Sequence, residues 1–171
     1  MTSTYILHQI SFLFLTKLFF GNYKKMLFTV ILVTLIPFLI YPSFIMAHFI
    51  LKFYVIFFVG LFLSYIIHEY LHIWCLKRSR QPGEIVVEFS LMKISLYPQF
   101  ELSKGEMLKV ALLPALALPI VGLGFVSIGT WTEQTFLTLT GYIYILHVIN
   151  ILPPLGDGIM ILKALLTNNS A

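Results

Sequence analysis

Charged residues are scarce in this sequence, because Asp, Glu, Lys and Arg together make up only 11% of its 171 residues. Apolar residues make up 59% and aromatic residues 16%. Soluble globular domains carry about 25% charged residues, so the composition excludes an ordinary soluble domain and is typical of a polytopic membrane protein. The single cysteine excludes a disulfide bond within the chain.

Four stretches are apolar and long enough to cross a bilayer, which takes a helix of about 20 residues. They cover residues 26–47, 53–76, 110–132 and 135–156. Residues 1–20 are apolar but contain His8, Gln9 and Lys17, so we expect an interfacial helix within an N-terminal segment of residues 1–25. A basic start and a small-residue cleavage site are missing, which argues against a signal peptide. We therefore predict a single membrane-embedded domain over residues 1–171.

Basic residues are predicted to gather on one side of the membrane. With four spans, ten of the eleven Lys and Arg residues fall on the side of both termini, and only Lys52 falls on the other. Lys and Arg are concentrated in cytoplasmic loops, so we expect both termini in the cytoplasm. The expected location is a bacterial cell membrane. This asymmetry accounts for the net charge of +4. The expected partner is the lipid bilayer, and no nucleic acid is expected, because no nucleic-acid motif is present.

An exception to the apolar pattern is the His-Glu-x-x-His motif at residues 68–72, inside the second predicted span. Ionisable groups at membrane depth are costly and mark functional sites. On a helix, two histidines four residues apart share one face and suit a single zinc ion, while Glu69 between them can reach a metal-bound water. Alternatively, the histidines hydrogen-bond to neighbouring helices and Glu69 pairs with Lys77 or Arg78.

A catalytic zinc usually takes three protein ligands, so a third donor is expected beside His68 and His72. Asp157 is the only aspartate in the sequence. It lies among two prolines and two glycines in residues 153–158, which cannot sustain a regular helix and can therefore re-aim the carboxylate. We favour Asp157 as the third ligand, and the alternative is a solvated carboxylate at a helix end.

Other donors remain open from the sequence. Cys75 shares the helical face of His68 and His72, although such a cysteine is more often apolar filler. Glu84 and Glu88 fall in the strand-like residues 84–97, where a short cytoplasmic β-hairpin is predicted and both side chains are expected to be solvated.

Two single histidines and one capping box predict further local features of the helices. His48 and His147 are single histidines in apolar surroundings and are expected to hydrogen-bond between helices. Ser103 and Glu106 have the spacing of a capping box and predict the start of the third span.

The order of these elements resembles the site-2 protease class of intramembrane zinc metalloproteases. The motif at residues 68–72 is followed by a strand-like insert, another span, Asn150-x-x-Pro153 and then Asp157-Gly158. The chain is most similar to the small relatives in this class known as putative zincin peptidases. The similarity covers residues 53–166.

This resemblance implies a metalloprotease-like core over residues 53–166. It implies that His68, His72 and Asp157 are zinc ligands and that Glu69 is the catalytic base. It also implies that Asn150 helps to hold the substrate or the strand insert.

The spacing of the last motif departs from the family pattern, Asn-x-x-Pro-x-x-x-Leu-Asp-Gly. Asp157 comes one position earlier after Asn150, and Gly156 replaces the leucine. One residue rotates a helical side chain by about 100°. The break at Pro153 and Pro154 must therefore absorb this rotation if Asp157 is to reach the metal.

The sequence thus predicts a mostly α polytopic bundle of about four transmembrane helices, with an N-terminal interfacial helix and a short cytoplasmic β-hairpin. The predicted function is an intramembrane zinc metalloprotease that hydrolyses peptide bonds of membrane-spanning or membrane-associated peptides. The alternative is a non-catalytic membrane protein for binding, immunity or scaffolding with a structural or vestigial metal site. A metal transporter is disfavoured because one cluster provides no relay of sites across the membrane.

Overall fold

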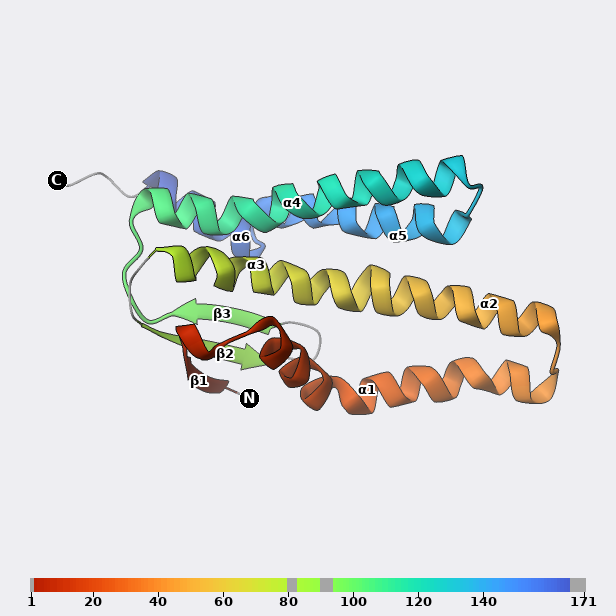
Figure 1. Ribbon diagram of the computed structural model, residues 1–171. Coiled ribbons are helices and arrows are strands. Elements are labelled where there is room, and N and C mark those ends of the chain that lie inside the picture. The colour runs from red at the N-terminus through yellow and green to blue at the C-terminus, as the bar shows by residue number, and fades with distance from the viewer. Residues whose placement is uncertain (1, 80–82, 90–93, 167–171) are drawn as a thin grey trace.

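Four long apolar helical stretches run side by side, and a small sheet packs beside one end of them (Figure 1). The computed structural model describes residues 2–79, 83–89 and 94–166. The four stretches are each long and apolar enough to cross a membrane and cover Phe12–Ile40, Phe44–Arg78, Lys104–Trp131 and Thr135–Leu166. The predicted mostly α fold with four membrane-length helices is confirmed.

The second and fourth stretches each contain more than one kind of helix. The helical elements in chain order are α1 (Phe12–Ile40), α2 (Phe44–Tyr54), the π-helical segment η2 (Val55–Leu63), α3 (Ser64–Arg78), α4 (Lys104–Trp131), α5 (Thr135–Leu146), the 3-10 segment η3 (His147–Ile151) and α6 (Gly156–Leu166). The His-Glu-x-x-His motif therefore lies in α3, directly after η2.

The turn between the first two helices comes earlier than the sequence predicted. It lies at residues 41–43 instead of next to Lys52. Pro42 has no backbone N–H with which to continue α1. The side chain of Ser43 then accepts a hydrogen bond from Met46 N and caps the next helix. Lys52 consequently lies inside the second helical stretch and not in a loop between spans.

The N-terminal residues also differ from the predicted interfacial helix over residues 1–20. They form strand β1 (Thr2–Ile6) and the short 3-10 turn η1 (Leu7–Gln9), and α1 then begins at Phe12. Three of the five residues of β1 are of the β-branched types Thr and Ile, which favour strands over helices. Ser11 accepts a hydrogen bond from Phe14 N at 3.1 Å and so fixes the start of α1.

A three-stranded antiparallel sheet with the order β1-β2-β3 is formed by β1, β2 (Glu84–Phe89) and β3 (Ile94–Pro98). The predicted hairpin of β2 and β3 is confirmed, and β1 adds a third strand that the sequence did not predict. Ile85 and Val87 of β2 are fully buried, whereas Glu84 and Glu88 are exposed.

The sheet and the N-terminal segment cover one face of α3. One buried apolar cluster joins them and includes Leu7, Leu15, Phe19, Ile66, Ile73, Ile85 and Val87. Lys77 near the end of α3 donates hydrogen bonds to the backbone oxygens of His8 at 3.2 Å and Ile10 at 2.8 Å. The motif-bearing helix is therefore held on this side by apolar packing and by one lysine.

Helices α4 and α5 form a close pair that extends to the end of the bundle away from the sheet (Figure 1). The predicted capping box of Ser103 and Glu106 is present and starts α4. Further along, a Cβ atom on Gly122 would lie 2.6 Å from the carbonyl oxygen of Gly141, and the reverse holds as well. The two backbones can approach this closely only because both residues are glycine.

Candidate metal centre

Two histidines of α3 direct a ring nitrogen toward one another across a single helical turn. His68 Nε2 and His72 Nε2 are 3.1 Å apart, and the residues are only 4% and 7% exposed. The four-residue spacing places both on one face of the helix, as the sequence predicted. The π-helical segment η2 precedes them, and π segments within α-helices are frequent near functional sites.

Asp157 reaches both histidines from the first turn of α6. Its Oδ1 lies 3.1 Å from His72 Nε2, and its Oδ2 lies 3.3 Å from His68 Nε2. Asp157 is 7% exposed, so it is a buried carboxylate and not the solvated helix end that was the alternative. The structure thus brings together the three residues that the sequence singled out as candidate ligands.

The turn before α6 sets the position of Asp157. Residues 152–155 are not helical, which is the interruption that the prolines predicted, and the Pro153–Pro154 peptide bond is cis. A Cβ atom on Gly158 would lie 2.5 Å from the backbone oxygen of Ile151. A glycine directly after Asp157 therefore allows the turn to pack tightly against the start of α6.

The donor set fits a zinc ion. Ligand atoms about 2.0–2.1 Å from a tetrahedral zinc are separated from one another by about 3.3 Å. The separations among the two Nε2 atoms and the Asp157 carboxylate oxygens are 3.1, 3.1 and 3.3 Å. Asp157 Oδ2 is buried and, among the described residues, is not aligned for a hydrogen bond with any group. Burying a carboxylate oxygen in this way is costly unless a cation compensates it.

His72 is held in the tautomer that a metal ligand needs. Its Nδ1 lies 2.9 Å from the backbone oxygen of Val110 in α4. A carbonyl oxygen can only accept, so Nδ1 carries the proton and donates it. The lone pair of the neutral ring is then on Nε2, which points at His68 and Asp157. A backbone carbonyl is a common outer partner of metal-binding histidines.

Glu69 is buried beside these groups, with 7% of its surface exposed. It lies three residues before His72 in α3, a spacing that places the two side chains as neighbours on the helix surface. The buried position next to the candidate ligands is the one that a proton acceptor for a metal-bound water requires.

A sequence model of one protein family matches residues 61–171, which is more than half of the chain, and the family is described as putative zincin peptidase. The chain belongs to the putative zincin peptidase family. The match includes the motif at residues 68–72 and also Asp157. Comparisons with curated proteins and with solved structures give no match. Family membership indicates a zinc-dependent metallopeptidase and confirms this part of the resemblance.

The other donors that the sequence left open do not join the metal centre. Among the described residues, the one group of His, Cys, Asp and Glu side chains that could hold a metal consists of His68, His72 and Asp157. Cys75 is half-buried in α3 and does not join them. Glu84 and Glu88 are exposed on β2, as expected.

Asn150 lies in η3 and is half-buried. Side chains three residues apart on a 3-10 helix lie on the same face, so Asn150 shares a face with His147. His147 lies beside His68, so this face of η3 is directed toward the metal centre. The role of Asn150 in binding substrate stays a prediction.

His147 and Ser64 lie next to the centre. The ring centroids of His147 and His68 are 5.0 Å apart, with planes inclined by 27°. His147 Nε2 lies 3.1 Å from Ser64 Oγ, so its expected hydrogen bond between helices is confirmed. Sequence reasoning missed Ser64. Its position four residues before His68, on the same helical face, is the signal that could have found it.

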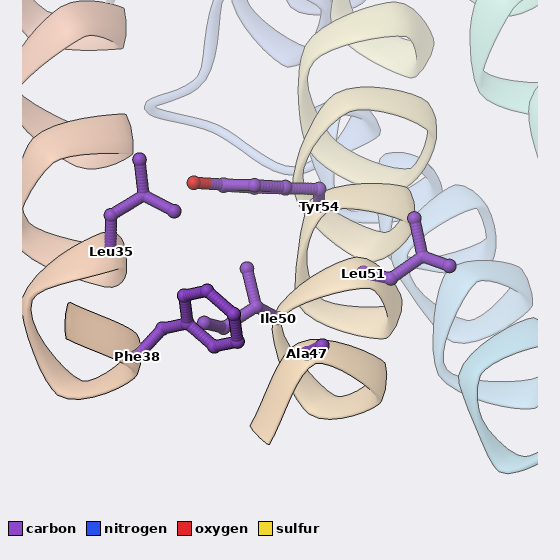
Figure 2. A pocket seen from close by; sticks show the side chains of 6 residues that line it. All are labelled: Leu35, Phe38, Ala47, Ile50, Leu51 and Tyr54. Carbon is purple, nitrogen blue, oxygen red and sulfur yellow. The ribbon is translucent and has the colours of Figure 1, made fainter. Parts of the chain in front are cut away.

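A groove with an apolar lining lies elsewhere in the protein, between α1 and α2 (Figure 2). It is lined by Leu35, Phe38, Ala47, Ile50, Leu51 and Tyr54. The Tyr54 hydroxyl forms a hydrogen bond of 2.8 Å with Thr34 Oγ1. Tyr54 is about 20 Å from His68 along the helix axis, so this groove is not part of the metal centre.

Proposed function

We propose that this protein is an intramembrane zinc metalloprotease of the site-2 protease type, which hydrolyses peptide bonds of membrane-spanning or membrane-associated peptides. One observation carries the proposal: His68, His72 and Asp157 converge inside a bundle of membrane-length apolar helices. Membership in the putative zincin peptidase family supports the metallopeptidase part of this proposal.

In the proposed site, His68, His72 and Asp157 would hold the zinc ion. Zinc supplies Lewis acidity, which makes a water molecule acidic enough to attack near neutral pH and polarises a peptide carbonyl. The Asp157 carboxylate contributes negative charge that offsets part of the charge of the cation in apolar surroundings. The hydrogen bond to Val110 keeps the His72 lone pair directed at the site.

Glu69 is the proposed general base. It lies one residue after His68 and three before His72 in α3 and is buried, so its carboxylate can take the proton from the attacking water. It then donates this proton to the amine nitrogen as the peptide bond breaks. A proton transfer of this kind contributes about 10²- to 10⁴-fold to the rate.

The proposed substrates enter from the lipid bilayer, because apolar helices surround the site. A helical substrate must unwind first, since its backbone groups are paired with one another in the helix. Asn150 is a proposed binding group for the released substrate backbone. In the described sheet β3 pairs on one side with β2, and its other side offers an edge to which an extended peptide could add.

We also propose that the site faces the cytoplasm. The three-stranded sheet and the C-terminal helix α6 lie at the same end of the bundle as α3 (Figure 1). The excess of Lys and Arg that the sequence places on this side supports a cytoplasmic orientation. The proposed location is a bacterial cell membrane.

The test compares the Glu69→Gln variant with the wild type in zinc content and in cleavage of a co-expressed membrane peptide. We expect zinc to be retained and cleavage to fall by about 10²-fold or more, because glutamine cannot accept the proton. Glu133→Gln is the matched control, since Glu133 is exposed in the turn between α4 and α5. Unchanged cleavage in Glu69→Gln contradicts the mechanism, and purified wild type without stoichiometric zinc contradicts the metal site.

A further inference from the structure

The two histidines of the metal centre differ in how their second ring nitrogen is satisfied. His72 Nδ1 donates to the backbone oxygen of Val110 at 2.9 Å. His68 Nδ1 is buried, and among the residues that the structure describes it has no hydrogen-bond partner. A neutral imidazole that offers Nε2 to a metal must carry its proton on Nδ1. A zinc-bound His68 would therefore hold a buried N–H group that needs an acceptor.

The ring of His147 lies next to His68 and can provide this acceptor. The Ser64 hydroxyl donates its proton to the backbone oxygen of Gly60, so Ser64 Oγ is left to accept from His147 Nε2. His147 therefore carries its proton on Nε2, and its Nδ1 has a lone pair. That Nδ1 is also buried, and it too lacks a hydrogen-bond partner in the described part of the chain.

The distance between the two rings suits a hydrogen bond. Their centroids are 5.0 Å apart and their planes are inclined by 27°. An N–H···N bond of about 2.9 Å between two imidazole edges corresponds to a centroid separation of about 5 Å. A small rotation of one ring about its Cβ–Cγ bond, or one bridging water, would connect the two Nδ1 atoms and leave both Nε2 contacts in place.

We propose that His147 is a positioning residue that accepts a hydrogen bond from His68 Nδ1 and so keeps His68 Nε2 directed at the zinc ion. Ser64 fixes the tautomer of His147. Ser64 and His147 together orient His68, as the backbone oxygen of Val110 orients His72. This inference rests on the proposed zinc site and adds two residues that act through His68. Outer partners of this kind contribute about 10- to 100-fold to metal affinity.

The first measurement is zinc affinity of the purified full-length protein by competition with a chelator. We expect His147→Phe to weaken zinc binding by about 10- to 100-fold, because phenylalanine keeps an aromatic ring but has no lone pair. His147→Asn should restore much of the affinity, since its amide oxygen can accept near the position of Nδ1. The matched control is His48→Phe, an exposed histidine of α2 that should bind zinc as the wild type does.

Ser64→Ala provides an independent variant if His147→Phe does not fold. The ring of His147 stays, but its tautomer is no longer fixed, so zinc affinity should fall by less than in His147→Phe and still measurably. The ¹⁵N and ¹H resonances of His68 Nδ1–H in the zinc-bound protein give a second readout. Loss of the acceptor should move this proton to higher field in His147→Phe but not in His48→Phe.

The outcomes separate this inference from the proposed function. If the wild type binds no zinc, the proposed function fails together with the inference. If the wild type binds zinc and both folded His147→Phe and Ser64→Ala bind it equally tightly, only the role of His147 is overturned. An unchanged His68 Nδ1–H resonance in His147→Phe leads to the same conclusion.

Discussion

The two ends of this helix bundle hold their helices together in different ways. At the end with the sheet, buried polar side chains of α3 and α6 meet at His68, His72 and Asp157. At the opposite end, α4 and α5 meet through backbone contact at Gly122 and Gly141. Both solutions suit an apolar environment, in which helices associate through close packing and hydrogen bonds.

The difference teaches which end is specialised for function. Glycine contacts need no buried polar group, so the α4–α5 end can be stable without a ligand. The metal-centre end carries two imidazoles and two carboxylates that are costly to bury. Changes to the residues of the metal centre should therefore affect metal binding, and changes at the glycine contact should affect stability alone.

The largest effect is expected for Asp157→Ala, which removes the carboxylate from the metal centre. Zinc affinity should fall by at least about a hundredfold, because losing a ligand exceeds the loss of an outer partner. The unfolding free energy of the zinc-free variant should differ little from that of the zinc-free wild type. Zinc competition and denaturant unfolding measure the two quantities. Wild-type zinc affinity in this variant would mean that another donor completes the site.

Gly122→Leu tests the opposite end. The added side chain meets the backbone of Gly141, so we expect a loss of about 2–3 kcal/mol in unfolding free energy. Zinc affinity of the folded fraction should stay at the wild-type value. Gly124→Leu is the matched control, because a Cβ at Gly124 has no atom within 4 Å. Equal destabilisation in both variants would show that the glycine contact is not the cause.

Gly158→Ala should affect the metal centre without removing any donor. Its Cβ would collide with the turn at Ile151, so the start of α6 and Asp157 must shift. We expect zinc affinity to fall about tenfold, the lower end of the range for supporting groups. Gly156→Ala is the control, since no atom lies within 4 Å of a Cβ there. If the two variants bind zinc equally, the turn does not position Asp157.

The smallest effect is expected for Lys77→Met, on the face of α3 opposite the metal centre. The variant loses two hydrogen bonds to the backbone of His8 and Ile10, which should cost about 1 kcal/mol. Hydrogen exchange in the N-terminal segment should become faster, while zinc affinity stays the same. Lys25→Met, at an exposed position of α1, should leave exchange unchanged. Hydrogen exchange in Lys77→Met as slow as in the wild type would show that apolar packing alone holds the N-terminal segment.

Local patterns predicted much of this fold. Hydropathy over about 20 residues predicted four membrane-length helices, and alternation predicted the hairpin of β2 and β3. The capping box of Ser103 and Glu106 predicted where α4 begins. The turn at Pro42 was missed because the apolar run continues through it, so hydropathy did not indicate an end. β1 was missed because its pairing with β2 joins segments that are far apart in the sequence.

The sequence by itself determined that His68 and His72 share a helical face with Glu69 beside them, because helix geometry fixes the relation of residues within one turn. It also indicated Asp157, the only aspartate, in a segment that cannot stay helical. Only the tertiary structure decided that Asp157 meets both histidines, that Val110 accepts a hydrogen bond from His72 and that His147 lies beside His68. Such contacts depend on how separate helices pack, and helix packing is set by the shapes of whole surfaces and not by local spacing.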